Sequence, residues 1–270
     1  MLLYFSTIKL SRTALITWSI IIWIYSFLVA YMYNSIKDTA EIENLIDVLP
    51  DHIKAAMGTT GDIDVFIDGI MDPNYFITQE YLAWLPLMLA IFSVFYCGGI
   101  ISREAERGTL DLLLSQPLAR KNLILCKLAA FLTMVILLLM FSCIGISIGL
   151  LIIGTSINLG HLFLAHIIIG LLIFAVSGYC TLLSCISMDP RHSIAYAGAI
   201  TSGMYILNFM VPTLGSFKWV ANLSLFHHLN IFNTLSSGTT NWDGSIVYLS
   251  TGVLCLVLAL LIFERRDLNY

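Results

Sequence analysis

Residues 128–153 read LAAFLTMVILLLMFSCIGISIGLLII, a stretch without a single charged side chain. About 20 apolar residues in a helix cross the hydrocarbon core of a bilayer, so this stretch predicts a membrane-spanning helix. Backbone groups in lipid must bond to one another, which favours helices over isolated strands. Five further stretches have the same character: approximately Thr13–Tyr33, Tyr81–Ile101, Leu162–Met188, Ser193–Val211 and Gly244–Phe263.

The composition of the whole chain agrees with these six stretches. Of its 270 residues, 59% are hydrophobic and 11% are charged, whereas a soluble domain carries about 25% charged residues. The ten-residue alternation of a membrane β-barrel is absent. We therefore expect an all-α integral membrane protein with six transmembrane helices, forming a single domain over residues 1–270 and preceded by a basic, amphipathic N-terminal segment.

The distribution of Lys and Arg predicts the orientation of these spans. Ten of the 13 basic residues fall at the termini or in alternate loops, and three fall on the other side. Since cytoplasmic loops carry the excess of positive charge, both termini are predicted to be cytoplasmic, with the chain in the cell membrane. The ten are Lys9, Arg12, Arg103, Arg107, Arg120, Lys121, Lys127, Arg191, Arg265 and Arg266; the three are Lys37, Lys54 and Lys218.

The predicted outer loop over 34–80 is acidic, and this loop accounts for the net charge of −4. Within it, 38–57 has the pattern of an amphipathic helix lying on the membrane or on the helix tops. Asp62, Asp64 and Asp68 do not have the spacing of a calcium loop. No basic helix or aromatic-rich basic patch suggests nucleic acid as a partner.

Chemistry-bearing patterns are missing from the sequence. His161, His166, His227 and His228 lack the spacing of a metal site, and no catalytic arrangement of Ser, His and Asp is recognisable. The chain has no GxxxxGK[ST] sequence, so it lacks a P-loop for ATP. We expect no catalytic residue, no metal and no cofactor in this chain.

The spans also lack Asp, Glu, Lys and Arg in their cores. Carriers driven by protons or ions usually hold a charged residue inside the membrane, where the coupling ion binds. The energy for any transport must therefore come from elsewhere, or the transport is passive. The apolar stretch over 213–242 is unusual for a loop and is predicted to be a re-entrant or interfacial helix pair, or a loop packed on the helix tops.

The loop between the second and third spans contains SREAERGTLDLLLSQPLARK over 102–121. Gly108 permits a chain reversal, Thr109 is a favourable N-cap, and Pro117 ends the short helix predicted over 109–117. Leu110, Leu113 and Leu114 form its apolar face. Such a short, rigid knob suits docking to a soluble partner, and an amphipathic connector lying among lipid headgroups is the alternative.

This stretch resembles the signature of ABC-2 type permeases, the membrane subunits of many ABC exporters. The resemblance implies a coupling helix that docks on a separate cytoplasmic ATPase subunit, which binds the ATP. It also implies a permease that dimerises or pairs with a second permease and moves a lipophilic or amphiphilic substrate. The matching positions are Glu104, Gly108, Thr109, Leu110, Leu113, Leu114, Pro117, Arg120 and Lys127, and Arg107 lies among them.

Outside this loop the resemblance is looser. Residues 222–228 look like a conserved-length "SPF" stretch of the same family, with Leu225 in place of the proline. Two other functions stay open: a membrane sensor or immunity factor linked to an ABC ATPase, and a passive channel or ATP-independent carrier. Co-purification of an ATPase distinguishes them.

Two faces of small residues allow close helix approach. One is the pair Gly145 and Gly149, and the other comprises Ala195, Ala199 and Gly203. Each face fits either a contact between two subunits or packing within one, and the sequence leaves both open. The second face is our candidate for a dimer interface.

Overall fold

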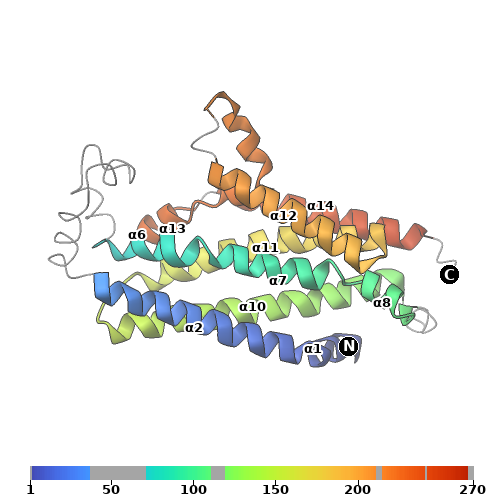
Figure 1. The fold of residues 1–270 in the computed structure, drawn as a ribbon, viewed down its shortest axis with the longest axis horizontal. Helices are drawn as coiled ribbons and strands as arrows, with labels where there is room; N and C mark the ends of the chain where they lie inside the picture. Colours follow the sequence, from blue (N-terminus) through green and yellow to red (C-terminus); the bar gives the residue numbers. More distant parts are fainter. Residues whose placement is uncertain (1, 37–70, 111–118, 211–214, 241, 267–270) are drawn as a thin grey trace.

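The computed structural model describes residues 2–36, 71–110, 119–210, 215–240 and 242–266. Throughout these ranges the regular elements are helices, and they run along one long axis as a bundle (Figure 1). The N-terminal helix, α8 and the end of α14 lie at one end of the bundle, and α6 and α13 lie at the other. We call the first of these the coupling end.

The bounds of the elements follow the chain closely. They are α1 (Leu2–Leu10), α2 (Arg12–Ile36), α6 (Pro73–Ile77), the π-helix η1 (Thr78–Leu82), α7 (Leu85–Cys97), α8 (Ser102–Glu106), α10 (Arg120–Ile152), α11 (Leu159–Ser187), α12 (Pro190–Met210), the 3₁₀-helices η3 (Gly215–Leu223) and η4 (Leu225–His228), α13 (Ile231–Ser237) and α14 (Trp242–Arg265).

Five helical stretches are long and apolar enough to cross a membrane, which confirms an all-α membrane protein. They are Arg12–Ser35, Pro73–Glu106, Arg120–Ile152, Leu159–Ser187 and Trp242–Arg265. The predicted fifth span, Ser193–Val211, corresponds to α12, which is 21 residues long but is not one of the five. Its Ser, Thr, Gly and Asn residues lower its hydropathy, so the count of six spans stays a prediction.

The observed helices extend beyond several predicted span limits. The second starts at Pro73 rather than Tyr81, and the third starts at Arg120 rather than Leu128. Hydropathy misses these turns because they contain polar residues such as Gln79 and Lys121. The side chain of Asp72 accepts the backbone N–H of Asn74 and caps α6, so the second helical stretch has a defined start.

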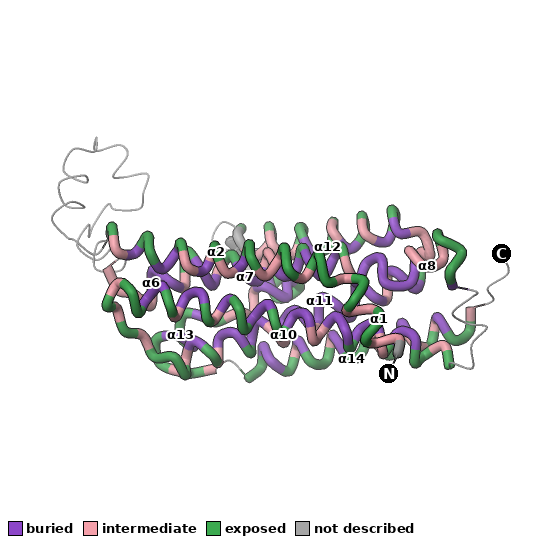
Figure 2. The backbone as a smooth tube through the Cα atoms, turned by 90° about the horizontal axis from the view of Figure 1, so that it is seen from below, coloured by how far each residue is buried: buried purple, intermediate pink, exposed green. Residues whose placement is uncertain are grey.

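The helix α11 forms the centre of the bundle. It packs against α7, α10, α12, α13 and α14. Figure 2 shows buried residues facing the inside of the bundle and exposed ones following the outside of each helix. Many exposed side chains are large and apolar, such as Ile136 and Leu151 of α10 and Leu254 of α14. A surface of this kind fits contact with lipid rather than water.

The helices α2 and α10 pack through the predicted small-residue face of the third span. A Cβ atom at Gly145 would lie 2.9 Å from the carbonyl oxygen of Trp23, and one at Gly149 would collide with the Cβ of Ala30. Both glycines thus allow close approach between two helices of the same chain. The structure places this GxxxG pair in an intramolecular contact.

A buried hydrogen-bond network joins α2, η1, α10 and α11. The Tyr81 hydroxyl lies 2.8 Å from Nε2 of His166 and 2.6 Å from Oγ of Ser142. Ser142 in turn lies 3.1 Å from Oγ of Ser26, and Nδ1 of His166 lies 2.8 Å from the carbonyl oxygen of Leu162. Every one of these polar groups has a partner, which the apolar surroundings require.

The apolar stretch before the last span contains η3, η4 and α13 rather than an uninterrupted loop. The carbonyl of Met204 in α12 accepts the Ser224 hydroxyl, and the carbonyl of Leu225 accepts the Tyr248 hydroxyl. These bonds tie η4 to α12 and α14. The amphipathic helix predicted over 38–57 lies outside the described residues.

Candidate functional site

The chain between α7 and α10 forms the candidate site at the coupling end. The helix α7 stops at Cys97, the chain turns over Gly98–Ile101, and α8 begins at Ser102. A Cβ atom at Gly98 would meet the carbonyl of Val94 and the side chain of Ile194. Glycine at this position therefore lets the turn lie directly against α12.

A cluster of three buried serines holds this turn in place. Oγ of Ser184 accepts the backbone N–H groups of Ile101 and Ser102, both at 3.1 Å. The Ser193 hydroxyl donates to the carbonyl of Gly98 at 2.5 Å. Since Ser184 is in α11 and Ser193 is in α12, the cluster satisfies the backbone groups freed by the break and fixes the turn to both helices.

An ion pair fixes α8 to α10. Nζ of Lys127 lies 2.6 Å from Oε1 of Glu104 and donates to the carbonyl of Ile100 at 3.1 Å. Lys127 is 8% exposed. The apolar part of its side chain lies within the bundle while its charge is paired, as a buried charge requires.

The hydroxyl of Thr109 closes the other side of Glu104. It donates to Oε2 of the Glu104 carboxylate and lies 3.3 Å from the Glu104 carbonyl. The backbone N–H of Thr109 donates to that same carbonyl at 3.1 Å. Gly108 between them has φ +65°, a left-handed conformation that glycine adopts without strain. The predicted chain reversal at Gly108 is confirmed.

Leu110 lies on the inner side of the loop. It is 1% exposed and belongs to a buried cluster with Ile100, Ile101, Leu123 and Ile124. Its side chain therefore contacts the bundle and is not available to a soluble partner in this conformation. Leu113, Leu114 and Pro117, the rest of the predicted coupling helix, lie outside the described residues.

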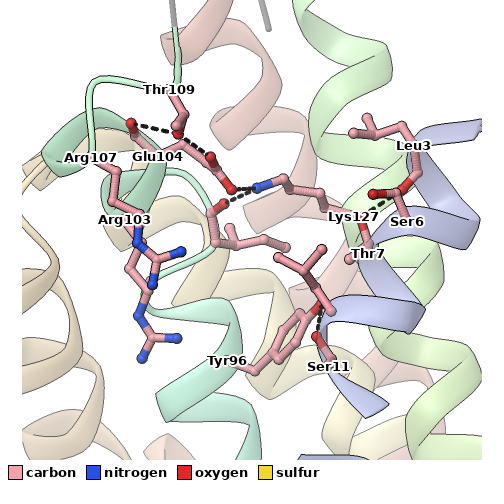
Figure 3. Close-up of a pocket in the computed structure, with 13 residues that line it drawn as sticks. Leu3, Ser6, Thr7, Ser11, Tyr96, Arg103, Glu104, Arg107, Thr109 and Lys127 are labelled. Carbon is pink, nitrogen blue, oxygen red and sulfur yellow. Dashed lines mark hydrogen bonds and ion pairs between the residues drawn. The ribbon is translucent and has the colours of Figure 1, made fainter. Parts of the chain in front are cut away.

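An open cavity of about 480 Å³ lies between α1, the α7–α8 turn and α10. Figure 3 shows Leu3, Ser6 and Thr7 of α1 on one side of it, and Arg103 and Arg107 on the other. Within the described part of the chain, neither arginine has an ion-pair partner. With Glu104 and Lys127 neutralising each other, the cavity carries an excess of positive charge.

Two arginines join the helix ends below this loop. Arg120 at the start of α10 donates to the carbonyl of Arg266 at 2.7 Å. Arg266 donates to the carbonyls of Cys185 and Ile186 near the end of α11, at 2.9 and 2.6 Å. Cations favour the negative end of a helix dipole, so these contacts stabilise the coupling end.

The start of α12 lies beside the same loop. The backbone N–H of Arg191 donates to Oδ1 of Asp189 at 2.8 Å, and the His192 ring lies 2.8 Å from Oδ2. These two contacts hold the pKa of Asp189 below its usual range. The carboxylate is therefore charged at neutral pH and caps α12.

The predicted dimer face has no contact with the rest of the chain in α12. Ala195, Ala199 and Gly203 are exposed, and a Cβ atom at Gly203 would meet nothing within 4 Å. The exposed side chains of Tyr196 and Ile200 flank this face. The structure thus brings the loop residues together but leaves this face open.

Several contributors to the site were not found from the sequence. Ser102, Ser184 and Ser193 carry no spacing signal because they come from three different helices. Arg266 entered only the count of basic residues. Among the described residues, no group of three or more His, Cys, Asp or Glu is arranged to hold a metal ion.

Comparison with known proteins gives one match. A family model described as ABC-2 family transporter protein matches residues 6–268. No curated protein and no solved structure matches the chain.

Proposed function

Because the chain belongs to the ABC-2 family of transporter proteins, as the membrane permease subunit of an ABC transporter, we propose that its coupling end docks a separate cytoplasmic ATPase. That partner binds and hydrolyses ATP, and this chain changes conformation in response. The loop over 102–117 carries the contact, with Arg107 and Gly108 on its exposed surface and Leu113 and Leu114 on the face that the partner grips.

The observation that carries this proposal is the attachment of the loop to several helices at once. Glu104 binds Lys127 of α10, and the backbone of Ser102 binds Ser184 of α11. Leu110 packs among residues of α10 and α14. A push on the loop would thus reach several helices as one rigid unit, which a loose connector in the headgroups could not achieve.

Two copies of the chain, or this chain and a similar permease, pair through the face formed by Ala195, Ala199 and Gly203. Small residues on an exposed helix permit close backbone approach within a membrane. The orientation with both termini in the cytoplasm of the cell places the coupling end next to the ATPase.

The substrate is lipophilic or amphiphilic, and it is exported. The described spans hold no unpaired charge in their cores that would bind a small ion, and aromatic side chains are frequent along them. Direction follows from the resemblance to ABC exporters and is part of the proposal.

Docking is tested by co-purification of the tagged chain with the ABC ATPase expressed from a neighbouring gene. Replacing Leu113 and Leu114 by Asp is expected to reduce ATPase recovery at least tenfold, because two carboxylates would be buried in an apolar contact. Leu159→Asp, at the exposed start of α11 on the opposite end of the bundle, serves as the control and should retain the ATPase. Undiminished recovery with the double variant, at normal membrane insertion, would overturn the docking role.

A further inference from the structure

A second open cavity lies at the end of the bundle opposite the coupling end. Its volume is about 550 Å³, which falls within the range of small-molecule sites. It is formed by η1 and the residues after it, by the end of α12, and by the segment from η4 to α13. Three separate parts of the sequence therefore contribute to it.

One charged side chain lines this cavity. Glu80 is exposed, and its carboxylate has neither a hydrogen bond nor an ion pair with any residue that the structure describes. Only its backbone carbonyl is engaged, by the hydroxyl of Tyr25. No Lys or Arg is among the described lining residues. The cavity thus presents one free negative charge and suits a monovalent cation.

Aromatic rings form much of the remaining wall. Tyr205 and Phe226 meet edge to face with their centroids 5.4 Å apart, and Phe232 meets Tyr75 in the same manner at 6.0 Å. Trp84 is 49% exposed, although it is a large apolar residue. Ring faces attract cations and also bury apolar surface, so this wall can hold both parts of an amphiphilic ligand.

The backbone around the cavity is irregular. Residues Thr78–Leu82 form a π-helix, in which the N–H of Ala83 donates to the carbonyl of Thr78 at 2.9 Å. Such turns are rare and are frequent at functional sites. The Thr78 hydroxyl is buried and lacks a partner within the described residues, and it lines the cavity. A buried hydroxyl without a partner calls for an explanation, and a ligand donor supplies one.

We infer that this cavity binds an amphiphilic ammonium ion. Its ammonium group lies at the Glu80 carboxylate and donates to the Thr78 hydroxyl and to the side-chain oxygen of Asn208 or Asn230. Its aromatic or alkyl body lies between Trp84, Tyr205 and Phe226. A divalent metal is a poor fit, because a single carboxylate does not provide the oxygen ligands that such ions take.

This inference goes beyond the docking proposal and does not depend on it, because binding can be measured on this chain alone. The full-length chain in phosphatidylglycerol nanodiscs presents no lipid ammonium group. The probe is dansylcadaverine, which joins a fluorescent aromatic body to a primary ammonium. N-acetyl dansylcadaverine has the same body without the charge. Fluorescence anisotropy, corrected with protein-free nanodiscs, gives both affinities.

We expect the wild-type chain to bind dansylcadaverine about fivefold more tightly than its acetylated form, the scale of one partly exposed charge pair. Glu80→Gln should abolish that preference while leaving the acetylated form unaffected. Asp243→Asn removes a carboxylate from the first turn of α14, which does not line the cavity, and should retain the preference. Equal affinities for both probes in the wild type, or an unchanged preference in Glu80→Gln, would overturn the inference.

A second arm identifies the natural source of the ammonium group. Adding phosphatidylethanolamine to the nanodiscs should raise the apparent Kd of dansylcadaverine if a lipid headgroup fits the cavity. An unchanged Kd assigns the cavity to a soluble ammonium ion. Trp84→Leu should weaken both probes alike, since it removes a ring and no charge, and selective loss of the charged probe alone would contradict the assignment of Trp84 to the ligand body.

Discussion

The contact between Glu104 and Lys127 decides the residue-scale behaviour of the coupling end. Glu104→Gln leaves the Lys127 ammonium buried with only the carbonyl of Ile100 as a described partner. Removing one member of a buried pair costs several kcal/mol. Since the Glu104 side chain is 24% exposed, we expect the free energy of unfolding to fall by about 2 kcal/mol, measured by thermal unfolding in detergent.

The control for this prediction is Glu106→Gln. Glu106 ends α8 and is exposed, and within the described ranges its carboxylate has no partner. Its removal should leave stability within about 0.5 kcal/mol of the wild type. Exchanging the charges, with Glu104→Lys and Lys127→Glu together, should recover part of the loss. Equal effects of the two Gln variants would show that the ion pair contributes nothing.

At this scale the sequence predicted positions better than contacts. The turn at Gly108 could be predicted because positive φ is nearly specific to glycine. Leu110 was predicted to share one outward face with Leu113 and Leu114, but its side chain packs inward against α10. Helical periodicity identifies the residues of a face, but it does not say which neighbour covers that face when the neighbour comes from another span.

At the scale of helices, two glycines with similar local sequences should respond in opposite ways. Gly149 lies against Ala30 of α2, whereas Gly203 faces open space on α12. Gly149→Leu should lower the free energy of unfolding by about 1–3 kcal/mol through overpacking. Gly203→Leu should leave monomer stability unchanged and reduce the dimer fraction, measured by native mass spectrometry. A stable Gly149→Leu chain would contradict the close packing of α2 on α10.

Helix existence was predictable because long apolar stretches carry a strong signal, and five membrane-length helices were confirmed. Helix ends were less predictable, because polar residues such as Gln79 continue a helix that hydropathy alone would end. The partner of the GxxxG pair could not be predicted. Small residues permit an approach from any helix, and only the packed bundle selects α2.

For the whole molecule, the excess of Lys and Arg at one end predicts the orientation in the membrane. A fluorescent protein fused after Tyr270 should fold and fluoresce, since it would stay in the cytoplasm. Alkaline phosphatase fused after Asn34 should be active, since it would be exported. Reversed signals from the two reporters would show that the coupling end faces outward and could not meet a cytoplasmic ATPase.

The hydrogen-bonded group of Tyr81, Ser142 and His166 sets a limit on how this bundle can rearrange. Sliding α11 by one turn moves its side chains about 5.4 Å along the axis, far enough to separate His166 from Tyr81. In hydrocarbon no water would replace that lost partner. The helices are therefore held at fixed relative heights, so they can tilt about this level with little loss but cannot move past one another like pistons.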